Sequence, residues 1–288
     1  MNAATVQPIA VAPDLPRRTV ALRLAQLRAV FGLSSRIALR GKRLWILALL
    51  GILPTLLPIL HIVASRLSSR VPPFPPAMEF FKTVVVSTVY LRVILYILAL
   101  AYGLAIISDE VESKTLVHLL LRPLPRWVIV LGRFLSTWLI AGLLLAGSLA
   151  LNYVLIWAAQ REAGAWKNLF SYANLRILLL DALVFFLALA AYLALFSCIG
   201  AWLRHGERWG VVFCFGWEWL IPYLPSKLKW FTVMYQVQTL FPHDVSVAKF
   251  FSLWGERFSK TACIAILLIA AAAFLALTVI NLKRREIR

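Results

Sequence analysis

Five long runs of apolar residues constrain the fold of this chain more than any other feature. They cover residues 44–63, 83–107, 134–158, 176–202 and 260–281. Each is about as long as a helix must be to cross a bilayer's roughly 30 Å hydrocarbon core, which takes about 20 residues. Helices are expected because backbone polar groups surrounded by lipid must be hydrogen-bonded within their own segment. The runs therefore predict an all-α membrane protein.

The overall composition supports this prediction. Hydrophobic residues make up 62% of the 288-residue sequence and charged residues only 15%, and the mean hydropathy is +0.84. A soluble domain of this length needs more charge to cover its surface. The net charge of +18 could indicate a nucleic-acid-binding protein, but the basic residues lie at the ends of the apolar runs, where they meet anionic headgroups. We therefore expect membrane lipids, and no nucleic acid, as partners.

A sixth apolar segment, residues 209–225, is short and is interrupted by Gly216, Glu218 and Pro222. The distribution of basic residues favours counting it as a span. With six spans, 18 of the 30 Lys and Arg residues fall on the side of the N-terminus, 11 fall on the opposite side, and one lies within a span. Because cytoplasmic segments carry the excess of Lys and Arg, both termini are expected in the cytoplasm. Five spans would export the basic tail Lys283–Arg288, so we predict six.

The basic segment before the first run has a helical pattern. Four apolar residues, separated by four, three and four positions, form one stripe on a helix, with three arginines near the opposite side. These residues are Val20, Leu24, Leu27 and Phe31, with Arg18, Arg36 and Arg40. Residues 17–40 therefore predict a helix lying in the cytoplasmic interface; the alternative is an ordinary basic flank that only fixes topology. We divide the chain into this tail, 1–43, and a single transmembrane domain, 44–288.

Residues 222–259, before the last span, are too polar to cross the membrane and too apolar for a free loop. They contain many aromatic residues. Short external helices that rest on the outer face, or dip into it, would suit this mixture. Two roles are open for this segment: an outer gate, or an aromatic belt at the interface.

The most specific stretch is residues 108–127, on the predicted cytoplasmic side between the second and third spans. Ser108 or Asp109 can cap a new helix, and the acidic residues that follow suit its positive N-terminus. Three leucines then fall on one face, and the helix should end before Pro123. The expected product is a capped helix of about 13 residues, roughly 20 Å long, that presents leucines and charges to the cytoplasm.

This stretch resembles the cytoplasmic motif of type-2 ATP-binding cassette (ABC) permeases. That motif has a glutamate, a Thr-Leu pair five and six residues later, a Leu-Leu pair, and Arg-Pro-x-x-Arg before the third span. The matching residues here are Glu110, Thr115, Leu116, Leu119, Leu120, Arg122, Pro123 and Arg126. Lys114 departs from the small residue, often Gly, that usually precedes the threonine. The six-span layout, the N-terminal helix and the outer segment also fit the family.

The resemblance implies that residues 108–127 form a coupling helix, which sits in a groove of a nucleotide-binding subunit and transmits its closure to the membrane helices. Glu110 would make the polar contact at the head of this helix. Leu116, Leu119 and Leu120 would form its buried face, and Arg122 and Arg126 would anchor it to the partner or to headgroups. Without the resemblance, the residues would favour a surface-lying helix whose charges are solvated.

The ATPase itself is expected on another chain. The sequence contains no G-x-x-x-x-G-K-[ST] phosphate-binding motif, and Gly41-Lys42 lacks both the upstream glycine and the following Ser or Thr. The resemblance therefore implies two copies of a nucleotide-binding ATPase subunit, which would hold ATP and Mg²⁺, and no cofactor in this chain. A second permease copy, identical or a sibling, would complete the assembly.

Two charged residues within predicted spans are candidates for the substrate pathway. Arg92 lies about nine residues, or roughly 14 Å, inside the second span. It would attract an anionic substrate or lipid headgroup, or be a structural arginine. Glu218 could line the pathway or pair with Arg92. Asp181, near the outer end of its span, is expected to snorkel to the surface, and Asn152 to make local hydrogen bonds.

We find no catalytic constellation or metal-ligand spacing in the sequence, and the three cysteines, all within apolar segments, are expected to be small buried residues. The chain is thus predicted to be the non-catalytic permease of an ATP-driven exporter of an amphiphilic or hydrophobic substrate in a bacterial plasma (inner) membrane. The alternatives are a non-ABC channel or secondary transporter, a membrane-embedded lipid-modifying enzyme, and an ABC-type mechanotransmitter that moves no solute.

Overall fold

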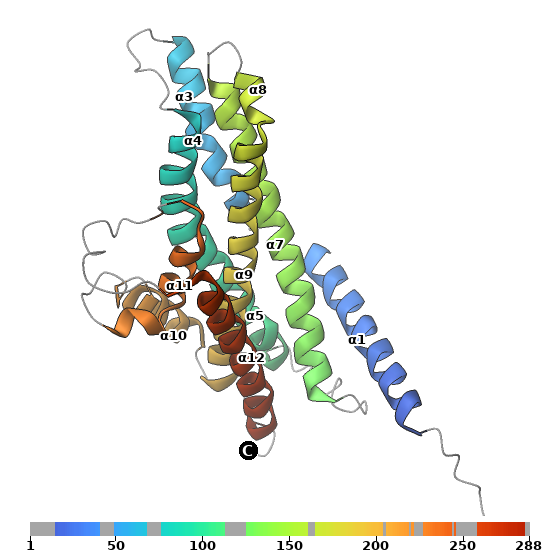
Figure 1. Cartoon of the computed structure of the whole chain (residues 1–288). Coiled ribbons are helices and arrows are strands. Elements are labelled where there is room, and N and C mark those ends of the chain that lie inside the picture. Colours follow the sequence, from blue (N-terminus) through green and yellow to red (C-terminus); the bar gives the residue numbers. More distant parts are fainter. Residues whose placement is uncertain are drawn as a thin grey trace, which may run out of the picture.

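The long apolar runs fold as long helices in a computed structural model of the chain (Figure 1). The structure describes residues 15–40, 49–67, 76–112, 125–160, 165–203, 206–218, 220–221, 227–243, 245 and 258–285, and within these ranges it contains no strand. Four helices are long and apolar enough to cross a membrane: Ala77–Ile106, Arg126–Ala159, Tyr172–Trp202 and Lys260–Leu282. They coincide with four of the five predicted runs, so the all-α membrane fold is confirmed.

The described elements are all helical and follow one another along the chain. They are α1 (Leu15–Arg40), η1 (Leu53–Thr55), α3 (Leu56–Leu67), α4 (Ala77–Phe80), η2 (Phe81–Ile94), α5 (Leu95–Glu112), α7 (Arg126–Ala159), α8 (Ala165–Leu169), α9 (Tyr172–Trp202), α10 (Gly206–Val212), η3 (Phe213–Glu218), η5 (Lys227–Phe231), α11 (Val233–Leu240) and α12 (Lys260–Arg285). Here η2 and η3 are π-helices, while η1 and η5 are 3₁₀-helices.

Helix α9 is the centre of the bundle. Two thirds of its most apolar window is buried, against 17% for α12, and it contacts α5, α7 and α12. Helix α5 approaches it closely at Gly103, where an added Cβ would lie 2.7 Å from the Cβ of Phe196. Small residues let membrane helices approach closely enough for dispersion contacts to hold them together. Gly103 therefore sets the distance between α5 and α9.

Exposed aromatic residues mark the two ends of the bundle. Trp127 begins α7 and Trp202 ends α9 at one end, and Trp166 and Tyr172 are exposed at the opposite end. Exposed apolar residues such as Ile269 of α12 lie between these levels. An apolar band between aromatic girdles is the pattern that a bilayer imposes. The chain is an integral membrane protein.

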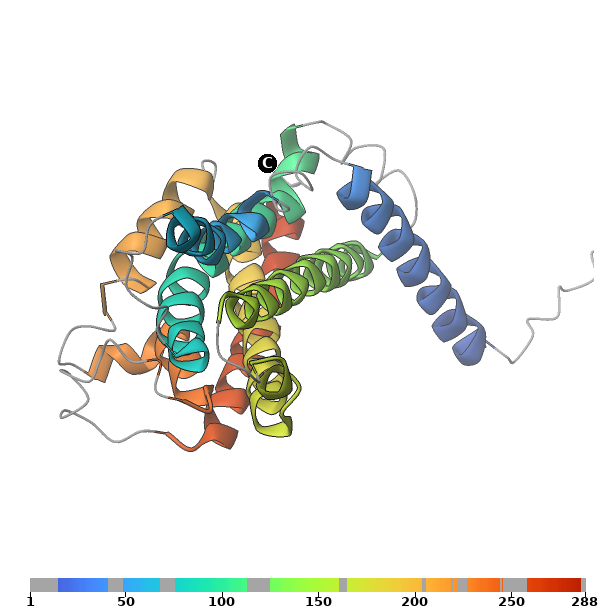
Figure 2. The same ribbon diagram turned by 90° about the horizontal axis from the view of Figure 1, so that it is seen from above.

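Helix α1 confirms the helix predicted for residues 17–40, and it leans against the start of α7 away from the other helices (Figures 1 and 2). The contact is close at Gly132, where an added Cβ would lie 2.8 Å from Cγ1 of Val30. Within the predicted stripe, Leu27 and Phe31 are half-buried and Leu24 is exposed. The interfacial position of this helix stays a prediction.

The first and the fifth predicted spans are the least regular. The described part of the first is a shorter apolar helix, Leu49–Ala64, with a 3₁₀ turn at Pro54, whose ring cannot donate a helical hydrogen bond. The predicted fifth span begins as α10 and η3, whose 13 residues, 206–218, reach only about 20 Å at 1.5 Å per residue. Four spans are thus supported by length, and the count of six stays a prediction.

The N-terminal half of the second predicted span is a π-helix rather than an α-helix. It covers the 14 residues of η2, and the side-chain hydroxyl of Thr88 donates to the carbonyl of Thr83 five residues earlier. From Leu95 the same helix continues as α5 in the α-helical register. Stretches of π-helix are rare and occur mostly at functional sites. This one contains Arg92.

Candidate functional site

The predicted coupling segment lies between α5 and α7. Helix α5 runs to Glu112 and α7 begins at Arg126, so both helices lead directly into the segment. Six of its predicted contact residues lie outside the described residues, namely Thr115, Leu116, Leu119, Leu120, Arg122 and Pro123. The backbone of Glu110 belongs to the last turns of α5, and Arg126 is half-buried.

The predicted start of the coupling helix is wrong. Ser108 and Asp109 do not cap a new helix, because α5 continues without a break from Leu95 to Glu112. The sequence between Ile106 and Glu112 contains neither Gly nor Pro, the two residues that most often end a helix. A short polar stretch without these residues can extend a membrane helix into water, so the second span carries its own rigid extension toward the coupling segment.

A hydrogen bond from Arg133 joins the two helices where the coupling segment begins and ends. Arg133 of α7 donates from Nη1 to the carbonyl oxygen of Ile106 in α5, at 3.1 Å. This bond joins the two helices at the point where both leave the apolar part of the bundle. In the sequence, Arg133 is one of the basic residues at the ends of the apolar runs. Its partner is a backbone carbonyl 27 residues away, which no local pattern could reveal.

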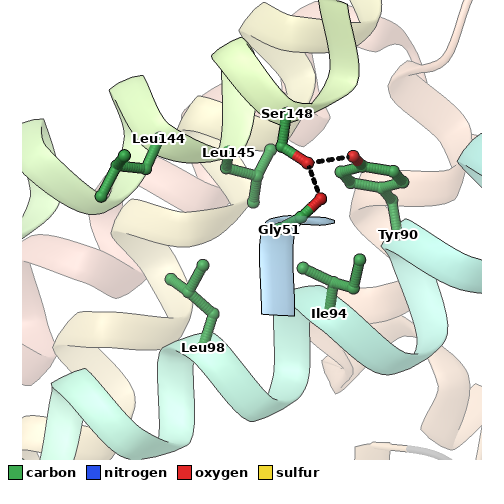
Figure 3. Close-up of a pocket in the computed structure, with 7 residues that line it drawn as sticks. All are labelled: Gly51, Tyr90, Ile94, Leu98, Leu144, Leu145 and Ser148. Atoms are coloured by element: carbon green, nitrogen blue, oxygen red, sulfur yellow. Dashed lines mark hydrogen bonds between the residues drawn. The ribbon is translucent and has the colours of Figure 1, made fainter. Parts of the chain in front are cut away.

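A polar cluster joins the first predicted span to η2 and α7 (Figure 3). The hydroxyl of Ser148 bonds both the carbonyl of Gly51 and the hydroxyl of Tyr90. Asn152 Nδ2 donates to the Tyr90 hydroxyl at 2.9 Å and to the Ser148 carbonyl at 3.0 Å, which confirms the prediction of local hydrogen bonds for Asn152. Bonds of this kind hold helices together where lipid offers no competing partner.

The same cluster lines a small pocket between these helices. Its other lining residues are apolar: Ile94, Leu98, Leu144 and Leu145. Arg92, two residues beyond Tyr90, lies half-buried in the last turn of η2. Arg92, the predicted pathway residue, therefore lies two residues from each of two pocket-lining residues, Tyr90 and Ile94. It belongs to the π-helical part of its span.

Glu218, the other predicted pathway residue, is buried at the end of η3. Its carboxylate accepts hydrogen bonds from the Tyr192 hydroxyl at 2.8 Å, from the backbone N–H of Val233 at 3.1 Å and from that of Met234 at 3.0 Å. The carbonyl of Glu218 accepts a longer bond, 3.4 Å, from the Tyr96 hydroxyl. The carboxylate therefore links α9 to the first residues of α11. Its pairing with Arg92 stays a prediction.

Asp181 does not snorkel. Its side chain is fully buried on α9, and Oδ2 lies 3.6 Å from Nε2 of His243, just beyond α11. The prediction assumed that water or headgroups cover this part of α9. Instead, the segment after α11 covers it, and the aromatic ring of Phe241 packs edge-on against Phe185 nearby. The imidazole gives the buried carboxyl a polar neighbour, and a polar group buried without one would be costly.

Buried tyrosines form polar contacts between helices that were not predicted from the sequence. Tyr90, Tyr96 and Tyr192 each lie in an apolar run, and each bonds a polar group of another element. Tyrosine in the middle of a membrane helix was the available signal, because its hydroxyl must find a partner there. The cysteines follow the prediction: Cys198, Cys214 and Cys263 are free and buried. In the part of the chain that the structure describes, no group of three His, Cys, Asp or Glu side chains could hold a metal ion.

Comparison with protein families identifies the chain. The family model described as "ABC-2 family transporter protein" matches residues 29–287, which is nearly the whole sequence. The chain belongs to the ABC-2 transporter family. No curated protein matches it.

An ABC-2 permease is the membrane subunit of an ABC transporter and normally works with a separate ATP-binding subunit. The match includes all the predicted spans and the segment between α5 and α7. The matched region begins at residue 29, so it includes the part of α1 in which Val30 packs on Gly132 of α7. The resemblance inferred from the local motif is therefore confirmed at the level of the family.

Proposed function

We propose that this ABC-2 permease is the membrane-spanning half of an ATP-driven exporter of an amphiphilic or hydrophobic substrate. Two copies of a nucleotide-binding subunit bind ATP and Mg²⁺, and a second permease copy, identical or a sibling, completes the assembly. Both termini lie in the cytoplasm of a bacterial cell, six spans cross its plasma membrane, and ATP-driven closure of the ATPase subunits moves these spans.

The observation that carries this proposal is the family match across the segment that joins α5 to α7. Two features of the fold support a mechanical role for that segment. Helix α5 extends without a break to Glu112, and Arg133 joins α7 to α5 by a hydrogen bond at the base of the segment. A force on the segment would therefore act on two membrane helices together, and through α5 on α9, its closest neighbour.

In this proposal each residue of the motif has the role that the family resemblance implies. Glu110 makes a polar contact with the ATPase subunit, Leu116, Leu119 and Leu120 bury an apolar face in its groove, Thr115 belongs to the same motif, and the helix ends before Pro123. Arg122 and Arg126 hold the helix to the partner or to headgroups. Each membrane half needs one such helix to follow the closure of the two ATPase subunits.

The test is purification of the tagged full-length chain from the membranes of its own organism in mild detergent. We expect a soluble ATP-binding protein to copurify, together with ATP hydrolysis that vanadate or a substitution in that protein's phosphate-binding lysine abolishes. A chain that is purified intact from native membranes with no ATP-binding protein, at any detergent tested, would be a channel, a secondary transporter or an enzyme instead.

Arg92 gives a separate prediction within this proposal. In the assembled complex, Arg92→Ala should lower the stimulation of ATP hydrolysis by an anionic amphiphile, such as phosphatidylglycerol, by roughly fivefold, which corresponds to about 1 kcal/mol. The loss is expected because an intramembrane cation attracts anionic groups. Arg92→Lys keeps the charge and should retain most of the stimulation. The comparison is made in proteoliposomes with and without the anionic lipid, and unchanged stimulation in Arg92→Ala would make Arg92 a structural residue.

A further inference from the structure

Helix α11 is a short helix buried inside the bundle. Val233, Met234, Val237 and Leu240 are all buried, and the helix contacts α9 and α12. Figure 1 shows α11 beside α9 at about half the height of the bundle, close to the start of α12. Helix α11, which belongs to the predicted external segment, is therefore packed among the membrane helices.

The start of α11 lies deep in the membrane. Its first two N–H groups share the carboxylate of Glu218 with the hydroxyl of Tyr192, and the hydroxyls of Tyr192 and Tyr96 are 3.4 Å apart. Tyr96 and Tyr192 each lie ten residues before the apolar spans end, at Ile106 and Trp202, which is about 15 Å along a helix. Half of a roughly 30 Å hydrocarbon core is the same distance, so α11 begins near the middle of the bilayer.

A helix that begins at this depth exposes unpaired N–H groups and a partial positive charge to an apolar environment, and Glu218 lies where it can bind both. The first N–H groups of a helix have no partner within it, and they carry its partial positive charge. In a membrane, each unsatisfied group costs several kcal/mol. Here Glu218 accepts from Val233 and Met234, and Thr232 accepts from Tyr235. The negative carboxylate both bonds the start of α11 and balances its dipole.

The other end of α11 is also fastened to the bundle. His243 lies 3.6 Å from Asp181 of α9, and Ser87 of η2 donates to the carbonyl of Val245 at 2.7 Å. The start of α11 is therefore attached through Glu218 to Tyr192 of α9, and the residues just after its end contact Ser87 of η2 and Asp181 of α9. The attachment at the start depends on one carboxylate.

We propose that Glu218 is a positioning residue that seats α11 as a re-entrant helix in the bundle, and that its negative charge, rather than its size, keeps α11 there. When Glu218 is held between Tyr192 and the start of α11, the helix fills the space between η2, α9 and α12. Release of the carboxylate would free α11 to move outward. The role of such a movement in transport rests on the proposed function, but the seating of α11 does not.

The experiment measures how well α11 is shielded from water. The full-length chain, with Cys198, Cys214 and Cys263 replaced by Ala, receives the single substitution Val237→Cys, and the rate of labelling by a charged maleimide is measured in membranes. Val237 is fully buried, so labelling should be slow. We expect Glu218→Gln to raise the rate about tenfold or more, since bonds to a charged group are the strong ones. Glutamine fits the same space, but its NH₂ group would face a backbone N–H.

Two matched variants make the result decisive. Glu218→Asp keeps the charge and should restore most of the protection of Val237→Cys. Leu149→Cys, equally buried but on α7, should stay protected in the Glu218→Gln background. The proposal is overturned if Val237→Cys stays protected in the Glu218→Gln background, or if Val237→Cys is labelled as fast with Glu218→Asp as with Glu218→Gln. It is also overturned if Leu149→Cys becomes labelled in the Glu218→Gln background, which would mean that Glu218 supports the whole bundle. The labelling needs neither ATPase nor substrate, so failure of the copurification test leaves this result standing.

Discussion

Replacing Glu110, Leu116 and Leu120 together with alanine is expected to release the ATP-binding subunit while the membrane fold survives. In the proposed complex the two leucines are buried in a groove of the partner, and their truncation should weaken binding by about 3 kcal/mol in total. That loss is on the order of 100-fold in Kd. Copurification of ATPase activity with the tagged chain measures it directly, and the elution profile in detergent reports whether the permease is still folded.

A matched control comes from the opposite end of the bundle. Leu57, Leu60 and Glu79 are exposed and offer the same residue types, so their triple alanine variant changes composition equally. It should retain the ATP-binding subunit at the wild-type ratio. If both variants retain it, the segment between α5 and α7 is not the coupling element, and if both lose it, the loss reports a general change in the membrane domain.

The second large effect is expected at Gly103. A methyl group there would lie 2.7 Å from Phe196 Cβ and 3.2 Å from the carbonyl oxygen of Leu193, and neither atom is the end of a flexible side chain. Gly103→Ala should therefore push α5 from α9 and destabilise the protein by about 1–3 kcal/mol, the usual range for overpacking. Thermal unfolding in detergent should show a lower midpoint.

Gly147 provides the control for this substitution. It lies in the middle of α7, as Gly103 lies in α5, but an added Cβ there would meet no atom within 4 Å. Because alanine favours the helix over glycine by roughly 1 kcal/mol, Gly147→Ala should leave the midpoint unchanged or raise it. We therefore expect the midpoint of thermal unfolding to fall in Gly103→Ala and to stay unchanged or rise in Gly147→Ala. Equal shifts at the two sites would contradict the close packing of α5 on α9.

The sequence predicts the long helices well, because length and apolarity decide them locally. The predicted run 176–202 became α9, Tyr172–Trp202, and the run 260–281 became α12, Lys260–Arg285. The helix expected for residues 17–40 is present as Leu15–Arg40. The family, too, could be predicted from about twenty residues, since the Thr-Leu and Arg-Pro-x-x-Arg pattern is specific.

What the sequence misjudged depends on partners far along the chain. Asp181 was expected to snorkel, but His243, 62 residues later, covers it. The extended helix α5 replaced the expected cap at Ser108, because Ser and Asp favour a cap only where the chain can turn. The π-helical register of η2 has no pattern of its own in the sequence; there, Ser87 bonds the backbone of Val245 and Tyr90 bonds Ser148.

Glu218 illustrates the limit most clearly. A carboxylate in an apolar segment correctly indicated a site that needs explanation. The partners that explain it are two backbone N–H groups and a tyrosine hydroxyl. Backbone groups are the same at every residue, so no sequence pattern identifies which of them a buried carboxylate will bind. The residues of the coupling segment from Thr115 to Pro123 lie outside the described residues, and their roles stay predictions.

The central claim is that a separate ATPase docks on the segment between α5 and α7, and site-specific photo-crosslinking tests it most directly. A photoreactive amino acid is placed at position 116, at position 120 or, as the control, at the exposed position Leu60, and intact cells are illuminated. The account predicts a covalent adduct with an ATP-binding protein from positions 116 and 120 and none from position 60. Illumination that yields no such adduct from 116 or 120, in chains shown to be folded in the membrane, would contradict it.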